Sequence, residues 1–498
     1  MPKMRSKRRG DHNLTDTLFT SIREGERWFI NQFGEDETFD ATKRLIHLWD
    51  KEILLLYMNG LVDGEVLTTL MTEMQDRNEL FTSEAVENMD RAMVDYFPYH
   101  SLEVVKDEDQ LAKAILSGLA VFVMKDGFTF ALDVRSYPGR SPEEPDTEKV
   151  IRGSRDGFTE NILTNTALIR RRLRTTDLRF EMHETSVKGK TDIAITFLKG
   201  AANEGHLNFV RERLDALETD GLTMTDKSLE EFLFKQGFHP MPFVRYTERA
   251  DICAAHLLEG HIAIIVDTSP SVILVPVTLV HHLQHAEEYR QAPLIGTFIR
   301  MVRFAGTFLS LVILPFWYLM SVEKQFVPEA IKYIGPNEWG EVPLFVQLMI
   351  ADVGIEVLRM AAIHTPTPLS TAMGLVAAIV IGQVAIDVGL FSSEVVLYVA
   401  VSAILTFAIP SFELSITTKV FRIFLLVSVA LLGAPGFFIA LAVIYYYLCS
   451  LKPMNVPYLW PFTPFFPKAL LRVLIRFPMT IDDPRPFITK SPNRDRMS

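Results

Sequence analysis

Three charged side chains interrupt an apolar stretch in the last third of the chain. Asp352, Glu356 and Arg359 are spaced i, i+4 and i+7, so a helix would carry them on one face. A charge at membrane depth costs several kilocalories per mole unless it faces protein or water. The stripe therefore predicts a helix that lines an ion pathway, or ion pairs that hold helices together, or an amphipathic helix outside the bilayer.

A second candidate site lies just ahead of the apolar part. His282 and His285 are spaced i, i+3 and Glu288 follows a turn later, a spacing that could hold a metal ion. Polar residues are also expected beside a first membrane segment, and we favour that interpretation, so no metal or other cofactor is predicted. The soluble part has no phosphate loop, dinucleotide glycine pattern, nucleophile elbow or His-Glu-x-x-His pair. No catalytic residue is predicted, and we do not expect an enzyme.

Charge and hydropathy divide the chain near residue 300. Residues 1–290 carry charges every few positions, whereas nearly all long uncharged runs follow Arg303. The net charge of −11 argues against a nucleic-acid partner. The basic start, Lys3 to Arg9, has no apolar run behind it and is not a signal peptide, so the soluble part is expected in the cytosol.

The soluble part contains a weak internal repeat. The apolar stretches Ile53–Met58 and Ile193–Leu198 both run into a glycine turn and then an amphipathic stretch. Gly118 and Gly260 each separate a helical pattern from a strand pattern, which fits a left-handed helix C-cap. We infer two related α/β subdomains.

The segment between the two repeats is rich in proline, glycine and charge, which predicts an irregular connector. The run Arg170 to Arg174 could bind phosphate or anionic lipid, but we favour a solvated face or an arginine network with neighbouring acids. The predicted organisation is a basic N-terminal arm and helix (1–39), α/β subdomain 1 (40–135), connector and arginine-rich helix (136–184), α/β subdomain 2 (185–290), helical transmembrane domain (291–452) and basic cytoplasmic tail (453–498).

The predicted membrane domain begins with Phe304–Val322, an uncharged run long enough to cross about 30 Å of hydrocarbon. Arginines precede this run and acids follow it, so the amino terminus is expected in the cytoplasm. Four more candidate segments follow: Pro343–Met360, Leu369–Leu390, Val395–Ile409 and Ile423–Cys449.

The tail is basic and should also be cytoplasmic, which requires an even number of crossings. Five candidates give an odd count. Either the helix with Asp352 is interfacial or re-entrant, or the last run is broken into two legs at Gly433-Ala434-Pro435-Gly436. We favour four full crossings.

Several short motifs follow one another in a set order along nearly the whole chain. In the soluble part they contain Glu144, Pro145, Glu148, Arg152, Gly153 and Arg155, and ahead of the first span they contain Glu287, Glu288, Tyr289 and Arg300. With these motifs the sequence resembles the spore germination receptor A-subunit (GerA-type) family.

The resemblance implies a protein of the inner membrane of the endospore, to which the hydropathy and charge pattern adds several passes and cytoplasmic termini. It implies a homo-oligomer, in membrane lipid and beside a second membrane subunit and other germination proteins, that conducts monovalent cations in response to germination signals. The Asp352, Glu356 and Arg359 stripe would be the pathway, with Asp387 and Glu413 as second candidates. The alternative is a non-conducting membrane scaffold that clusters germination proteins.

Overall fold

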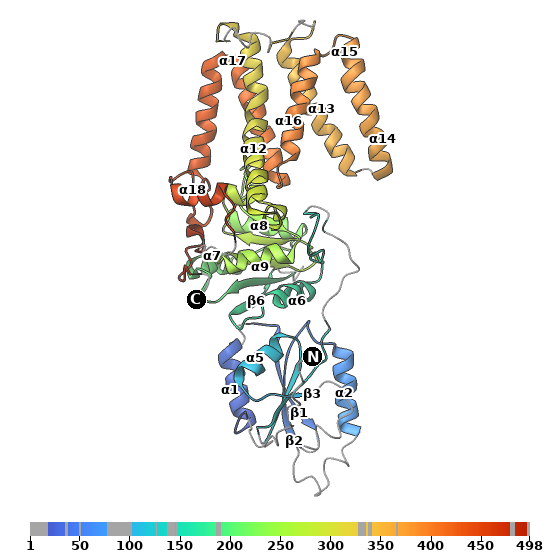
Figure 1. The fold of residues 1–498 in the computed structure, drawn as a ribbon, viewed down its shortest axis with the longest axis vertical. Coiled ribbons are helices and arrows are strands. Elements are labelled where there is room, and N and C mark those ends of the chain that lie inside the picture. Colours follow the sequence, from blue (N-terminus) through green and yellow to red (C-terminus); the bar gives the residue numbers. More distant parts are fainter. Residues whose placement is uncertain are drawn as a thin grey trace, which may run out of the picture.

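The computed structural model is elongated, with two sheet-containing units stacked beneath a group of long helices (Figure 1). Residues 1–17 of the predicted N-terminal arm and Glu144 of the family motif lie outside the described residues. The residues that the structure describes are 18–34, 38–48, 51–76, 102–125, 127–136, 145, 148–185, 191–326, 335–336, 341–364, 367–478 and 484–495.

The first unit is a five-stranded sheet with helices on both faces. Its strand order is β1-β2-β4-β5-β3, and all neighbouring strands are antiparallel. Alternate residues of β2 point to opposite faces, so Leu54 and Leu56 lie in one core and Ile53 and Leu55 in the other. The elements are α1 (Ile22–Phe33), β1 (Ala41–Leu48), β2 (Lys51–Met58), α2 (Gly64–Asp76), β3 (Leu102–Val104), α5 (Glu108–Leu116), β4 (Ala120–Met124) and β5 (Thr129–Leu132).

The second unit repeats this plan. Its strand order, β6-β7-β9-β10-β8, matches the first unit position by position, and all neighbouring strands are again antiparallel. The predicted pair of related α/β subdomains is thus confirmed as a fold. The elements are α6 (Ile162–Arg172), β6 (Leu178–Thr185), β7 (Thr191–Leu198), α7 (Glu204–Asp215), α8 (Thr225–Phe234), β8 (Arg245–Thr247), α9 (Ala250–Leu258), β9 (Ile262–Val266) and β10 (Val272–Val275).

Gly118 and Gly260 occupy equivalent turns in the two units. Each glycine comes shortly after the end of a helix and has a positive φ, +87° for Gly118 and +91° for Gly260. A Cβ at either position would lie 2.7 Å from a backbone oxygen, that of Leu61 in the first unit and of Ala201 in the second. Only glycine therefore allows these helices to turn so closely into the following strands.

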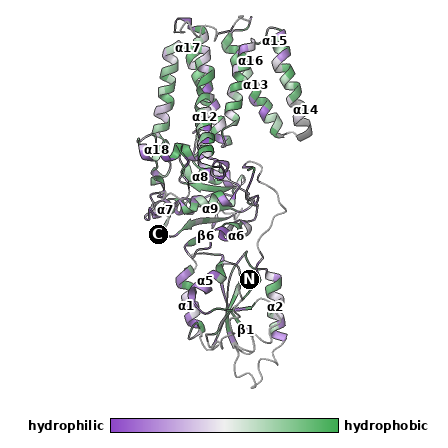
Figure 2. Cartoon of the chain, in the orientation of Figure 1, coloured by the Kyte–Doolittle hydropathy of each residue, from purple (hydrophilic) through white to green (hydrophobic). Residues whose placement is uncertain are grey.

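The carboxyl-terminal part is helical, and apolar residues line its long helices (Figure 2). By length and composition, α12 and α17 could each cross a membrane. The elements are α10 (Leu279–Leu283), α11 (Ala286–Arg290), α12 (Pro293–Val322), α13 (Leu344–His364), α14 (Thr367–Ala377), the π-helical η3 (Ala378–Val384), α15 (Ala385–Asp387), α16 (Ser393–Phe407), α17 (Phe412–Ser450), α18 (Pro467–Leu474) and the 3-10 turn η5 (Phe487–Thr489).

The helix α17 reverses direction at Gly433, whose φ and ψ of 62° and −141° are not helical. The rings of Phe421 and Tyr447 lie 6.0 Å apart, whereas a straight helix would separate them by about 39 Å at 1.5 Å per residue. The backbone N–H of Ala434 donates to Glu323 Oε1 (2.9 Å), which satisfies a group freed by the break. Of the two alternatives that the sequence left open, the break of the last run into two legs agrees with this geometry.

The expected number of four crossings differs from the number of helical legs. The legs are α12, α13, α14 with α15, α16 and the two halves of α17. Six legs still bring the chain back to the side of the soluble units, where α18 lies (Figure 1). The helix with Asp352 stands beside the other legs, contacting α16 and α17, which differs from an interfacial position.

Two helices begin earlier than the uncharged runs predicted. The first leg starts at Pro293 rather than Phe304, and α17 starts at Phe412 rather than Ile423. The added turns carry arginine and lysine, which hydropathy alone places outside a span. These cations bond acids of neighbouring elements, so helix continues through them.

Candidate functional site

A buried charged pair of the helical region joins α13 to α17. Arg422 donates from Nη2 to Asp352 Oδ1 (2.6 Å) and from Nε to Asp352 Oδ2 (3.4 Å). The side chains are 1% and 3% exposed. Arg422 Nη1 also donates to the carbonyl of Ser310 on α12 (3.0 Å) and to the hydroxyls of Ser402 (2.7 Å) and Thr406 (3.1 Å) on α16. One guanidinium thus links four helices.

The rest of the stripe also faces α17. Lys419 Nζ donates to Glu356 Oε2 (2.8 Å) and to the carbonyl of Asp352 (3.1 Å). Arg359 donates from Nε to Glu356 Oε1 (3.0 Å) and from Nη1 to Ser415 Oγ (3.1 Å). Within one chain, Asp352 and Glu356 therefore form interhelical ion pairs with α17, whereas Arg359 pairs with Glu356 on its own helix and reaches α17 through Ser415.

Sequence reasoning missed the cations of this network. Lys419 and Arg422 lie three residues apart, the spacing that lets two side chains share one helix face. This spacing, directly ahead of an apolar run, was the available signal. Together with Arg359 they give three cations against the two carboxylates of Asp352 and Glu356.

The second candidates of the sequence lie outside this network. Asp387, on α15, is exposed and accepts a hydrogen bond from Gln383 Nε2 (3.0 Å). Glu413 lies in the first turn of α17 and accepts from Ser411 Oγ (2.9 Å).

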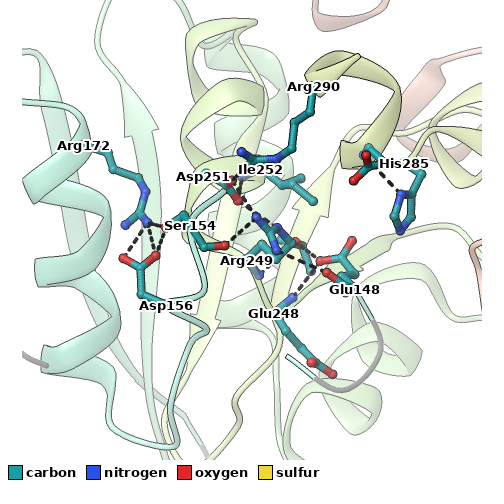
Figure 3. A network of polar contacts seen from close by, with 12 residues as sticks. Glu148, Ser154, Asp156, Arg172, Glu248, Arg249, Asp251, Ile252, His285 and Arg290 are labelled. Atoms are coloured by element: carbon teal, nitrogen blue, oxygen red, sulfur yellow. Dashed lines mark hydrogen bonds and ion pairs between the residues drawn. The ribbon is translucent and has the colours of Figure 1, made fainter. Parts of the chain in front are cut away.

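A second polar network joins the connector to subdomain 2 (Figure 3). At its centre is Arg249, which precedes α9 and is 1% exposed. Its Nε and Nη2 donate to the two carboxylate oxygens of Asp251 (3.0 and 2.8 Å). Its Nη1 donates to the carbonyl of Glu148 (3.2 Å) and Nη2 to that of Ser154 (3.0 Å). The arginine thereby fixes an irregular segment against α9.

Glu148 of the family motif is held on the other side of this network. Its Oε2 accepts from Thr247 Oγ1 (2.6 Å) and from the backbone N–H of Glu248 (3.2 Å). Arg245 Nη2 lies 3.7 Å from Oε1. Burial raises the pKa of the Glu148 carboxyl, although Arg245 and Thr247 act to lower it.

The other motif residues of the connector divide between packing and exposure. Pro145 lies against Gly157, where an added Cβ would come within 3.0 Å of the proline ring. Gly153 has a φ of +129° and leaves room for the guanidinium of Arg290. Arg152 and Arg155 are exposed and are not part of the network.

The short helix α11 bonds both to the connector and to α12. Arg290 Nη2 donates to Asp251 Oδ2 (2.6 Å), and Glu287 Oε2 accepts from the backbone N–H of Ile151 (3.2 Å). The fully buried Glu288 accepts from Arg300 Nε (2.8 Å) and from Arg303 Nη1, both on α12. Consecutive side chains of α11 therefore tie the soluble region to the first long helix.

Tyr289 completes this motif, with the guanidinium of Arg300 5.2 Å above its ring.

The residues with metal-ligand spacing do not share a site. His285 Nδ1 accepts from the backbone N–H of Glu287 (3.2 Å), and Glu288 is held by arginines. His282 is buried beside the ring of Tyr458, and burial lowers the pKa of His282 to about 3. No group of three or more His, Cys, Asp and Glu in the described part of the chain could hold a metal ion.

The arginine run in α6 is used within the fold. Arg170 is fully buried and donates from Nε and Nη2 to Asp40 (3.0 to 3.2 Å). Its Nη1 donates to the carbonyls of Thr175 (3.1 Å) and Leu178 (3.2 Å). Arg172 bonds Asp156. These two contacts correspond to the predicted arginine network with neighbouring acids.

The chain belongs to the family described as Bacillus/Clostridium GerA spore germination protein, whose sequence model matches residues 28–488. It therefore has a role in spore germination, and the family resemblance noted in the sequence is confirmed. Its two long apolar helices agree with association with a membrane.

Among curated relatives, the stage V sporulation protein AF of Bacillus subtilis (strain 168) is 48% identical over 483 residues, covering 96% of this chain and 97% of that protein. Spore germination protein KA of the same organism is 30% identical over 443 residues, covering 87% and 80%. Among solved structures, the N-terminal domain of the A subunit of the Bacillus megaterium spore germinant receptor GerK3 matches at 23% identity and a TM-score of 0.40, covering 52% of this chain and 96% of that chain.

Proposed function

We propose that this chain is the membrane subunit of an oligomeric assembly that conducts monovalent cations during spore germination. In this proposal the soluble region biases a closed-to-open equilibrium of the helical region. Supporting observations are the family, the six helical legs and the contacts of α11 with both regions.

The observation that carries the proposal is the buried pair of Asp352 and Arg422. Apolar side chains of similar volume are often as stable as a buried ion pair, and the best-attested use of such a pair is to fix a register or a switch. The guanidinium bonds three helices besides its own, so any opening of the bundle has to break or re-form its bonds. We assign to this pair the role of holding the helices together in the closed state.

The candidate pathway residue is Asp387 rather than Asp352. The leg formed by α14 and α15 lies at the edge of the bundle (Figure 1), and its apolar side chains at Leu375, Val376 and Ile379 are exposed. In a homo-oligomer built through the membrane domain, this leg would lie between subunits. The exposed pair of Gln383 and Asp387 would then border the pathway, where a carboxylate favours cations.

The remaining parts of the proposal concern location and partners. The assembly lies in the inner membrane of the endospore with residues 291–452 as the membrane domain. Both termini are cytoplasmic, since arginines precede the uncharged part of the first leg and the tail is basic. A second membrane subunit and other germination proteins complete it.

Potassium release from germinating spores tests the pathway. The chromosomal copy carries Asp387→Asn or, as a matched control at the same end of the bundle, Glu341→Gln, and protein levels are checked by immunoblot. We expect Asp387→Asn to slow potassium release at least about threefold, because it removes a carboxylate that attracts cations, and Glu341→Gln to behave as wild type. Wild-type release from Asp387→Asn spores would remove this residue from the pathway.

A non-conducting scaffold that clusters germination proteins is the second candidate. The observation that favours it is that Nε, Nη1 and Nη2 of Arg422 all have partners within this chain, so this buried charge needs no water-filled passage. The scaffold predicts that Asp387→Asn leaves potassium release unchanged while the membrane clustering of other germination proteins still depends on the chain.

A further inference from the structure

A pocket lies where the carboxyl-terminal tail meets the base of α12. It has a volume of about 460 Å³, and its walls come from α10, α12, α18 and η5. Trp460, Phe466 and Phe487 make one part of the wall apolar. The charged residues that line it are Arg300, Lys468, Arg472, Arg485, Arg494 and Glu259. With five cations and one carboxylate, the pocket favours an anion.

Two buried N–H groups of the lining have no acceptor among the residues that the structure describes. They are Nε1 of Trp460 and Nη2 of Arg300, and the two residues are 8% and 3% exposed. The other guanidinium nitrogens of Arg300 are bonded, Nε to Glu288 and Nη1 to the carbonyl of Val473 (2.9 Å). A buried donor without an acceptor costs about 1 to 3 kcal/mol. Both groups are donors, so the matching ligand carries acceptor oxygens.

The position of α18 indicates where such a ligand comes from. This helix lies directly at the foot of the long helices (Figure 1). It carries both apolar and polar residues (Figure 2), with Val473 buried and Leu471 exposed. Lys468 and Arg472 are spaced i, i+4 and share one face. A short amphipathic helix with basic residues is typical of the membrane surface, where anionic lipid headgroups gather.

We propose that this pocket binds a phosphate group, presented by an anionic phospholipid of the leaflet beside the soluble region. The phosphate oxygens accept from Trp460 Nε1 and Arg300 Nη2, while Lys468 and Arg494 supply positive charge at the mouth, since both are exposed. Acyl chains can leave along the apolar wall. The site does not depend on ion conduction.

Thermal unfolding of the full-length protein in neutral detergent micelles tests the ligand. Phosphatidylglycerol, phosphatidylcholine and inorganic phosphate are titrated separately. We expect phosphatidylglycerol to raise Tm at concentrations where phosphatidylcholine has no effect. A shift with inorganic phosphate at equal phosphate concentration would support the phosphate pocket but overturn the lipid as its source. No shift with either anion, or equal shifts with both lipids, would overturn the proposal.

Variants locate the binding. Lys468→Gln combined with Arg494→Gln should weaken the phosphatidylglycerol response about tenfold or more, because two charge-assisted contacts are lost. Trp460→Phe should weaken it about threefold to tenfold, because the indole N–H that donates to a phosphate oxygen is lost.

The matched control is Lys452→Gln, which removes an exposed cation of the same end of the chain outside the pocket. It should respond to phosphatidylglycerol as wild type does. A wild-type response from both pocket variants, or an equal loss in the control, would contradict the assignment.

Discussion

The two sheet units share one plan but differ in the polarity of one corner. α5 and α9 occupy equivalent places, and each ends at a glycine with positive φ. Where the second unit buries His256 and His261, the first has Ala114 and Leu119. Where Asp107 caps α5, Arg249 precedes α9 and holds the connector.

This difference in polarity corresponds to the parts of the chain that each unit contacts. The second unit lies next to the helical region and the connector, whereas the first lies at the far end of the molecule (Figure 1). The arrangement of strands and helices that both units share comes from apolar strands and glycine turns. In the second unit, the buried Arg249 uses its position ahead of α9 to bind the connector.

The largest effect is expected at the seam between the units, where Asp40 precedes β1 and pairs with Arg170 of α6. Asp40→Ala leaves a fully buried guanidinium without its carboxylate and should lower the free energy of unfolding by about 3 to 5 kcal/mol. Urea unfolding of the full-length protein in detergent measures it. Asp40→Ala with Arg170→Met should recover part of the loss; a single variant as stable as wild type would mean that the pair does not join the units.

The next effect compares equivalent positions of the two units directly. Arg249→Ala removes charge-assisted bonds to Asp251 and two connector carbonyls and should cost about 3 kcal/mol. Asp107→Ala removes one helix N-cap, the bond from the backbone N–H of Gln110 (2.7 Å), and should cost about 1 kcal/mol. Urea unfolding measures both variants. Equal losses of unfolding free energy would show that the two positions contribute equally to stability.

Acid should destabilise the folded protein through His282 of α10. The folded-state pKa of about 3 lies below the unfolded value of about 6.5, so the folded protein binds fewer protons in this interval. Stability is full above pH 6.5 and falls as the pH drops toward 3, by about 2 kcal/mol at pH 5. Urea unfolding at pH 7.5 and pH 5 measures this difference. His282→Phe should reduce the difference by about that amount, and an unchanged difference would exclude His282 as its source.

The smallest effect comes from making the second corner resemble the first. His261→Leu introduces the residue type found at Leu119 and should change the free energy of unfolding at pH 7.5 by less than about 1.5 kcal/mol, because the two side chains have similar volumes. Urea unfolding at that pH tests it. A loss above about 3 kcal/mol would show that the buried ring has an essential role that the comparison does not reveal.

Local sequence patterns predicted the strands and turns of the two sheet units well. Apolar stretches such as Ile53–Met58 and glycines such as Gly118 determine strands and turns through nearby residues alone, and the break at Gly433 followed from the same logic. Ion pairs between distant segments leave no such local trace. The partners of Asp352 and Glu356 are 70 and 63 residues away in sequence, directly ahead of an apolar run, and only the packing of α13 on α17 brings them together.

The starts of α12 and α17 were misjudged for a related reason. Charge was used to end a span, but Arg300, Arg303, Lys419 and Arg422 continue their helices because each bonds an acid on another element. A basic residue at the edge of an apolar run therefore marks the end of a long helix only when no carboxylate of another element can reach it.

The claim that the helical region conducts cations is tested most directly by the reversal potential across a planar bilayer. The bilayer receives the assembly purified from spores through a tag on the full-length chain, under a gradient of potassium chloride. We predict a current that reverses near the potassium equilibrium potential, and a reversal shifted toward zero for Asp387→Asn. A current no greater than that of the same preparation from spores lacking the chain would contradict conduction.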